Sequence, residues 1–183
     1  MKIKKISALL LAFVMVIAFT GCSPVKKAEK VVSDTFEALK VLDFETSGKY
    51  LDLDAMQIGD EESGLSTQLI ASTLFGKLNY EIVSTEEVDK EHVTVKTKIT
   101  AIELEPFMQT FIESVLKKSF ENLKEAELTE AEVKKQYEEI FAETAKNPNL
   151  AMKTQEVDIK VVKKDGKWII EPDEAFTMAL LGQ

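Results

Sequence analysis

Apolar residues recur at intervals of three and four positions between residues 25 and 42, which is the pattern of an amphipathic helix with one buried face. The following segment is less regular and favours a short helix over residues 46–52, with a loop after it. Residues 64–78 carry a second, more modest apolar stripe of helical spacing. These helices need another layer of secondary structure to cover their apolar faces.

In the middle of the chain the pattern changes from helical spacing to alternation. Residues 79–84 and 93–101 alternate between the two faces of a strand, are rich in β-branched side chains and are separated by a charged turn. Residues 157–161 and 168–170 alternate in the same way around an Asp-Gly dipeptide, which is typical of a two-residue hairpin turn. These segments predict two antiparallel hairpins.

Helical spacing returns between the two predicted hairpins. Pro106 marks the change, and residues 107–123 carry a strong apolar stripe. A capping box, Thr-Glu-Ala-Glu, begins a further helix at residue 129, and a short helix is expected near the end of the chain. Helices and antiparallel strands in separate blocks predict a single α+β domain over residues 28–183. Its N-terminal helices are expected to accompany a curved antiparallel sheet of about four strands, with a helical insertion between the two hairpins.

The first residues are typical of a secretion signal. Three lysines precede an uncharged apolar run over residues 6–20, which is shorter than the roughly 20 residues that span a bilayer. The run ends in Phe19, Thr20, Gly21 and Cys22, which resemble the lipobox of bacterial lipoproteins, with Phe19 where Leu is usual. The resemblance implies that Phe19, Thr20 and Gly21 direct cleavage by a signal peptidase and that lipid is attached to Cys22.

This lipoprotein interpretation divides the chain into a signal peptide over residues 1–21, a short membrane-proximal stem over residues 22–27 and the domain. It predicts a protein on the extracytoplasmic face of the cell membrane, held by lipid on Cys22. An uncleaved or ordinary signal peptide with a chance cysteine is the alternative. Because Cys22 is the only cysteine, we expect no disulfide and no cysteine-based metal site.

The charge of the chain argues against nucleic acid as a partner. Its 23 basic residues are all lysine and face 32 acidic residues, which gives a formal net charge of −9. Surfaces that bind nucleic-acid phosphates need a basic face and usually contain arginine. Removal of residues 1–21 takes away three lysines, so the 20 that remain against 32 acids give −12. Lys26, Lys27 and Lys30 favour a domain whose basic end faces anionic lipid, and solvated lysines on a helix face with no lipid role are the alternative.

Few residues are candidates for catalysis or metal binding. His92 is the only imidazole and follows Glu91, so neither a catalytic triad nor a zinc site with several histidines can be assembled. In the acidic stretch over residues 52–63, Gln57 and Ser63 stand at the sixth and twelfth positions, where a hand-type calcium loop requires glycine and glutamate. We therefore expect no metal and no cofactor.

Three aromatic residues are candidates for lining a ligand pocket, and plain core positions are the alternative for each of them. They are Tyr80, Phe107 and Trp168. No cluster of polar residues accompanies them in the sequence, so the ligand and any protein partner stay unknown.

Two parts of the chain resemble a family of small bacterial lipoproteins. The first predicted helix with residues 44–51, and the strand, turn and strand over residues 161–170, are similar to lipoproteins with a nuclear-transport-factor-2-like or cystatin-like domain. Many members are domains of unknown function, and some proteins of this fold class place a carboxylate at the base of an apolar cone.

The predicted function is that of a non-enzymatic binding or interaction module anchored to the membrane. A small-molecule isomerase or hydrolase that uses a carboxylate in a cone-shaped pocket is one alternative, and a buried acid at the bottom of a cavity would favour it. A structural envelope protein that packs on a partner through the helical insertion is the other. A contiguous exposed apolar patch on residues 107–123 would favour that one.

Overall fold

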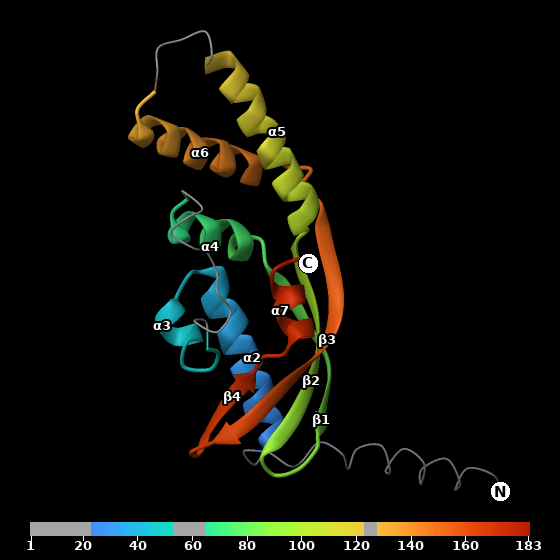
Figure 1. Ribbon diagram of the computed structural model, residues 1–183. Helices are drawn as coiled ribbons and strands as arrows, with labels where there is room; N and C mark the ends of the chain where they lie inside the picture. The colour runs from blue at the N-terminus through green and yellow to red at the C-terminus, as the bar shows by residue number, and fades with distance from the viewer. Residues whose placement is uncertain (1–22, 53–64, 123–127) are drawn as a thin grey trace, which may run out of the picture.

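The computed structural model describes residues 23–52, 65–122 and 128–183, and within them it contains a four-stranded antiparallel sheet with helices before and after it (Figure 1). The predicted α+β class is confirmed. The strand order is β1-β2-β3-β4, and the sheet is open, with β1 and β4 at its edges. In chain order the elements are α2 (Pro24–Lys40), α3 (Phe44–Ser47), α4 (Thr67–Gly76), β1 (Asn79–Glu87), β2 (His92–Ile102), α5 (Leu104–Asn122), α6 (Glu130–Ala145), β3 (Met152–Lys164), β4 (Lys167–Glu171) and α7 (Glu174–Leu180).

The two predicted hairpins lie side by side in this sheet, and β2 pairs with β3 at its centre. The pairing runs from His92 opposite Val162 to Ile102 opposite Met152. Alternation in β2 is confirmed, because its inward-facing residues are buried while most of their neighbours are more exposed. The inward-facing residues of β2 are Val93, Val95, Thr97, Ile99 and Ala101.

β1 departs from regular alternation at a β-bulge. Its register with β2 shifts between Ile82 and Ser84, so Val83 is an extra residue in this strand. Regular alternation would place Ser84 on the same face as Ile82. The bulge instead brings Thr85 to that face, where its hydroxyl donates a hydrogen bond of 2.8 Å to Oε1 of Glu29.

α2 packs across the sheet and contacts all four strands. It begins at Pro24, because the hydroxyl of Ser23 accepts a hydrogen bond from the Lys26 N–H at 3.3 Å and proline suits the first helical position. Residues 24–27, expected to belong to a stem, are therefore the first turn of this helix. The apolar stripe of α2 is buried, and Phe36 stacks on Tyr80 with ring centroids 4.7 Å apart.

Some helix boundaries differ from the predicted ones for local reasons. α3 starts at Phe44 instead of residue 46, because Oδ1 of Asp43 accepts the Thr46 N–H at 3.0 Å and caps the helix there. α5 starts at Leu104 and includes Pro106 in its first turn, where backbone N–H groups have no partner within the helix.

α5 and α6, which we call the arm, confirm the predicted helical insertion between the hairpins (Figure 1). The predicted capping box is present, since the hydroxyl of Thr129 accepts the Glu132 N–H and the Glu132 carboxylate accepts the Thr129 N–H. The sheet with α2, α3, α4 and α7 forms the rest of the molecule, which we call the body. A small cluster centred on Ile102, Phe107 and Phe141 connects the two parts.

The last residues of the chain are fixed to the junction between β2 and the arm. The carbonyl of Gly182 accepts the Leu104 N–H at 3.0 Å. Gly182 has a φ of 67°, and a Cβ atom there would collide with the carbonyl oxygen of Ile102. Only glycine fits this position without a shift of the backbone.

Candidate functional site

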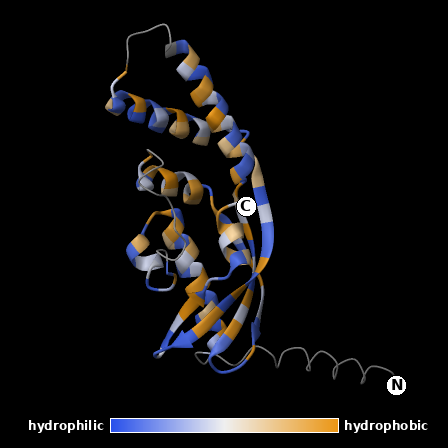
Figure 2. Cartoon of the chain, in the orientation of Figure 1, coloured by the Kyte–Doolittle hydropathy of each residue, from blue (hydrophilic) through white to orange (hydrophobic). Residues whose placement is uncertain are grey.

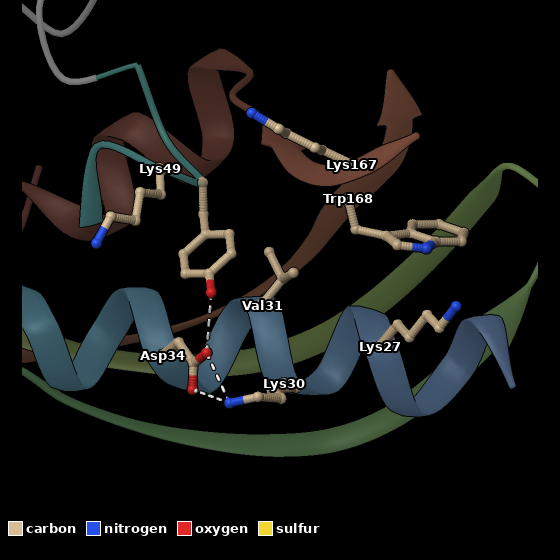
Figure 3. A pocket seen from close by; sticks show the side chains of 8 residues that line it. Lys27, Lys30, Val31, Asp34, Lys49, Lys167 and Trp168 are labelled. Atoms are coloured by element: carbon tan, nitrogen blue, oxygen red, sulfur yellow. Dashed lines mark hydrogen bonds and ion pairs between the residues drawn. The ribbon is translucent and has the colours of Figure 1, made fainter. Parts of the chain in front are cut away.

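A groove of about 450 Å³ opens on the body between the N-terminal half of α2, the segment after α3 and strand β4 (Figure 3). It combines apolar and positively charged side chains. We call this site the groove, and its lining residues are Lys27, Lys30, Val31, Asp34, Lys49, Tyr50, Lys167 and Trp168.

Backbone interactions between segments that are far apart in the sequence hold the walls of the groove together. The Ile170 N–H donates a hydrogen bond of 2.7 Å to the carbonyl of Tyr50, which attaches the segment after α3 to the edge strand β4. Asp165 and Gly166 have φ angles of 51° and 79°, as a tight hairpin turn requires, and the chain re-enters the sheet at Lys167. Trp168 shares its face of β4 with the buried Ile170, so it lies on the side of the sheet that α2 covers.

The floor of the groove is apolar, and its one acidic residue, Asp34, already has hydrogen-bond partners. Val31 is buried, while Tyr50 and Trp168 are half-buried. The Tyr50 hydroxyl lies 3.2 Å from Oδ2 of Asp34, and Nζ of Lys30 lies 2.8 Å from both carboxylate oxygens (Figure 3). The hydrogen bond to Asp34 and its charge raise the pKa of Lys30.

Positive charge dominates the rim. Four lysines against one aspartate give the groove a formal net charge of +3, in a chain whose net charge is −9. Lys49 has only an exposed contact of 3.7 Å with Glu45. Within the described ranges, Lys27 and Lys167 form no ion pair with a carboxylate. The groove can therefore attract an anion and cover an apolar or aromatic part of it.

The three aromatic residues singled out from the sequence lie in separate places. Trp168 lines the groove, Tyr80 packs against Phe36 in the main core, and Phe107 is buried in the cluster of the arm. Sequence reasoning did not connect Tyr50 with Trp168, because nothing in the local pattern shows that their segments are joined by a backbone hydrogen bond.

The described residues offer little catalytic or metal-binding chemistry. None of their aspartates or glutamates is buried, so the feature that would favour an isomerase or hydrolase does not occur there. Among the described residues, no three histidine, cysteine, aspartate or glutamate side chains come together as potential metal ligands. Most of the acidic stretch over residues 52–63 lies outside the described residues.

His92 begins β2 and is exposed, and Asp89 is its partner across the turn. Nδ1 of His92 lies 2.8 Å from Oδ1 of Asp89. Hydrogen bonds from the Glu91 N–H and then from His92 lower the pKa of Asp89. The sequence reading found no partner for His92, because the turn that brings Asp89 back to it is not an apolar pattern. This pair fixes the β1–β2 turn, where the N–H groups of Glu91 and His92 also donate to Oδ1 of Asp89.

The arm presents a second unusual surface. Ile112, Leu116 and Phe120 follow each other at intervals of four on α5, and their exposed fractions are 51%, 53% and 67%. We call these three residues the ridge. α6 covers a different side of α5, where Phe141 contacts Phe107 and Phe111 with ring centroids 5.1 and 5.2 Å apart. Figure 2 shows apolar segments on α5 well beyond the sheet.

The predicted lipidation site lies outside the described residues, as do the predicted recognition residues before it. These are Phe19, Thr20, Gly21 and Cys22.

In the described parts of the chain, no helix is long and apolar enough to cross a membrane.

No family model, curated protein or solved structure matches the chain. The resemblance to lipoproteins with a nuclear-transport-factor-2-like or cystatin-like domain therefore stays a prediction, and the groove and the ridge are the features that bear on function.

Proposed function

We propose that the chain is a lipid-anchored, extracytoplasmic binding module without enzymatic activity, and that the groove is its ligand site. The observation that carries the proposal is the +3 charge of the groove residues around an apolar floor, on an otherwise acidic chain. The lipobox-like residues that end in Cys22 support the anchor.

The ligand class follows from the lining of the groove. A ligand with an apolar or aromatic part can cover Val31, Tyr50 and Trp168, and burial of such surface is favourable by about 25 cal/mol per Å². Lysine ammonium groups attract a phosphate, sulfonate or carboxylate as point charges. We therefore expect an anionic amphiphile.

Binding is favoured over catalysis by the state of Asp34. Lys30 and Tyr50 already hydrogen-bond to its carboxylate, so this acid is held as a structural partner and is poorly placed to take a proton from a ligand. No histidine or cysteine lines the groove.

The fluorescence of Trp168 gives a direct test, because it is the only tryptophan of the chain. Octyl phosphate, used below its micelle-forming concentration, should change this fluorescence in a saturable way. The variant Lys27→Glu/Lys167→Glu should bind it at least about tenfold more weakly, since each lysine near an anionic surface contributes about 1 kcal/mol. The control Lys134→Glu/Lys135→Glu changes the net charge equally on the arm and should bind as wild type.

An absent or non-saturable signal would overturn the groove as a ligand site, and so would equal weakening in both charge variants. The anchor is tested separately by the intact mass of the membrane-extracted protein. Wild type should have the mass of the chain from Cys22 with acyl groups, and Cys22→Ala should lack them. An unmodified full-length mass in both would contradict the anchor.

A second candidate function, packing on a partner protein through the arm, is favoured by the exposed ridge. Its three large apolar residues form a contiguous row on a helix that contacts the body only near its base. A photo-crosslinking residue at Leu116 should give a discrete adduct in cells, while the same residue at Lys134 should not. No adduct at either position would contradict docking through the ridge.

A further inference from the structure

We propose that the groove binds the phosphate headgroup of an anionic phospholipid in the membrane that carries the protein, and thereby orients the domain on that membrane. This inference rests on the proposed ligand site and on the proposed anchor at Cys22. It names the ligand and adds a role to the lysines and aromatic residues that line the groove.

The groove lies near the start of α2, close to the predicted anchor. α2 starts at Pro24, two residues after Cys22, and rises about 1.5 Å per residue. Lys27 and Lys30 therefore lie only about 5 and 9 Å along the helix from its start. The headgroup layer on each side of a bilayer is about 5 to 7 Å thick. Lipid on Cys22 thus brings the near end of the groove to the level of the headgroups.

The strand β4 of the body starts at the same end of the molecule. The start of α2 and the turn between β3 and β4 lie together there, and the arm lies at the opposite end (Figure 1). Lys167 is the first residue of β4 after that turn. Lysines from two elements, Lys27 from α2 and Lys167 from β4, therefore surround the same opening, and neither forms an ion pair with a carboxylate in the described ranges.

The kinds of residue in the groove fit a membrane interface. Tryptophan and tyrosine are enriched where lipid headgroups meet water, because their rings are apolar and carry one polar group. Trp168 and Tyr50 are both half-buried, so each has surface left for a ligand. Lysine side chains can lie along apolar surface and keep their ammonium groups at the phosphates.

Charge distinguishes the groove from the rest of the molecule. The chain as a whole is acidic and is repelled by anionic lipid, whereas the residues of the groove carry a formal net charge of +3. The lysines that line the groove come from α2, the segment after α3 and β4, so they are spread around it instead of lying on one helix face. Binding should therefore depend on the groove lysines more than on the total charge of the protein.

The test uses the mature chain with Cys22→Ser, which removes the acyl anchor and leaves all described elements in place. Its probes are vesicles of phosphatidylglycerol, vesicles of phosphatidylcholine, and octyl phosphate. Wild-type protein should co-sediment with phosphatidylglycerol vesicles and shift the emission of Trp168 to shorter wavelength, and it should do neither with phosphatidylcholine.

Lys27→Glu/Lys167→Glu should lose at least about tenfold in affinity for phosphatidylglycerol, and Lys134→Glu/Lys135→Glu should bind as wild type. Trp168→Phe, which keeps an apolar ring in the fold, should bind more weakly while its thermal unfolding stays close to wild type. Equal loss in the two charge variants would overturn the groove as a headgroup site, because general electrostatic attraction would then explain the binding.

The two proposals fail in distinguishable ways. Saturable binding of octyl phosphate without binding to phosphatidylglycerol vesicles would overturn the headgroup as ligand and leave the groove as a site for a soluble anion. Absence of both would overturn the proposed ligand site together with this inference.

Discussion

The body and the arm both contain a long amphipathic helix, but they bury its apolar residues to very different extents. In α2 the stripe residues Ala28, Val32, Phe36 and Leu39 have no exposed surface, because the sheet covers them. In α5, which is two residues longer, the ridge is at least half exposed. The apolar spacing of a helix therefore shows that it has a face to cover, but the fold decides whether the same chain covers it.

This contrast predicts different consequences for the same kind of substitution, and the largest concerns Phe36. It contacts Tyr80 and Phe176 in the middle of the main core. Phe36→Ala should lower the free energy of unfolding by about 3–5 kcal/mol in urea titrations, because it leaves a cavity that neighbouring residues cannot fill. Phe120→Ala removes the same ring from the arm and should change it by less than about 0.5 kcal/mol. Similar losses in both would contradict the division into a covered and an uncovered helix.

The connection between body and arm is tested at Gly182. Gly182→Ala should lower the free energy of unfolding by about 1–3 kcal/mol, because the added Cβ meets the Ile102 carbonyl and the left-handed backbone is strained. Gly76→Ala at the end of α4 is the matched control, since a Cβ there meets no atom within 4 Å. Hydrogen exchange should also become faster at the start of α5 in Gly182→Ala. An unchanged stability would show that the end of the chain does not hold this junction.

Most of the body is predictable from the sequence because its helices and strands carry regular apolar periodicity. In β2 every second residue is apolar or β-branched, so strand and inward face are both readable, as Val93 and Ile99 illustrate. β3 begins at Met152, five residues before its predicted start. Residues 152–156 are mostly polar and carry no apolar alternation, so only their pairing with β2 identifies them as strand. The bulge at Val83 has no local signal, since it exists only in the register between two strands.

The groove is less predictable than the sheet for a similar reason. Trp168 is a candidate from composition alone, and Lys27 and Lys30 are noticeable near the predicted anchor. The backbone hydrogen bond that joins the Tyr50 segment to the Trp168 strand connects residues more than a hundred positions apart, and the Tyr50 hydroxyl reaches α2 through Asp34. Such a long-range contact leaves no periodicity in either segment.

Low pH should destabilise the body and the arm by protonating different helix-capping carboxylates. The Phe176 N–H and Lys160 lower the pKa of Asp173 at the start of α7 in the body. A lowered folded-state pKa means that the stabilisation is complete above the unfolded pKa of about 3.9 and is lost as the pH falls through the lower folded value. Asp173→Asn should therefore reduce the dependence of the urea midpoint on pH between about 5 and 2, by less than about 1 kcal/mol because 36% of the side chain is exposed to screening solvent.

In the arm, hydrogen bonds from the backbone and hydroxyl of Thr129 lower the pKa of Glu132, so the sign of the effect is the same. Glu132→Gln should alter hydrogen exchange in α6 over the same acid range and leave the urea midpoint of the body unchanged. A shift of that midpoint would mean that arm and body unfold as one unit.

The smallest expected effect on stability is at Leu116, and it separates folding from docking. Leu116→Glu should change the free energy of unfolding by less than about 0.5 kcal/mol, because the side chain is 53% exposed and glutamate favours helices nearly as well as leucine. If the ridge packs on a partner protein, the same substitution places a charge in the centre of the contact. It should then abolish the adduct formed from a crosslinking residue at Phe120. A persistent adduct with unchanged stability would mean that the ridge is exposed without being used, whereas a large loss of stability would mean that the arm is covered by its own chain in solution.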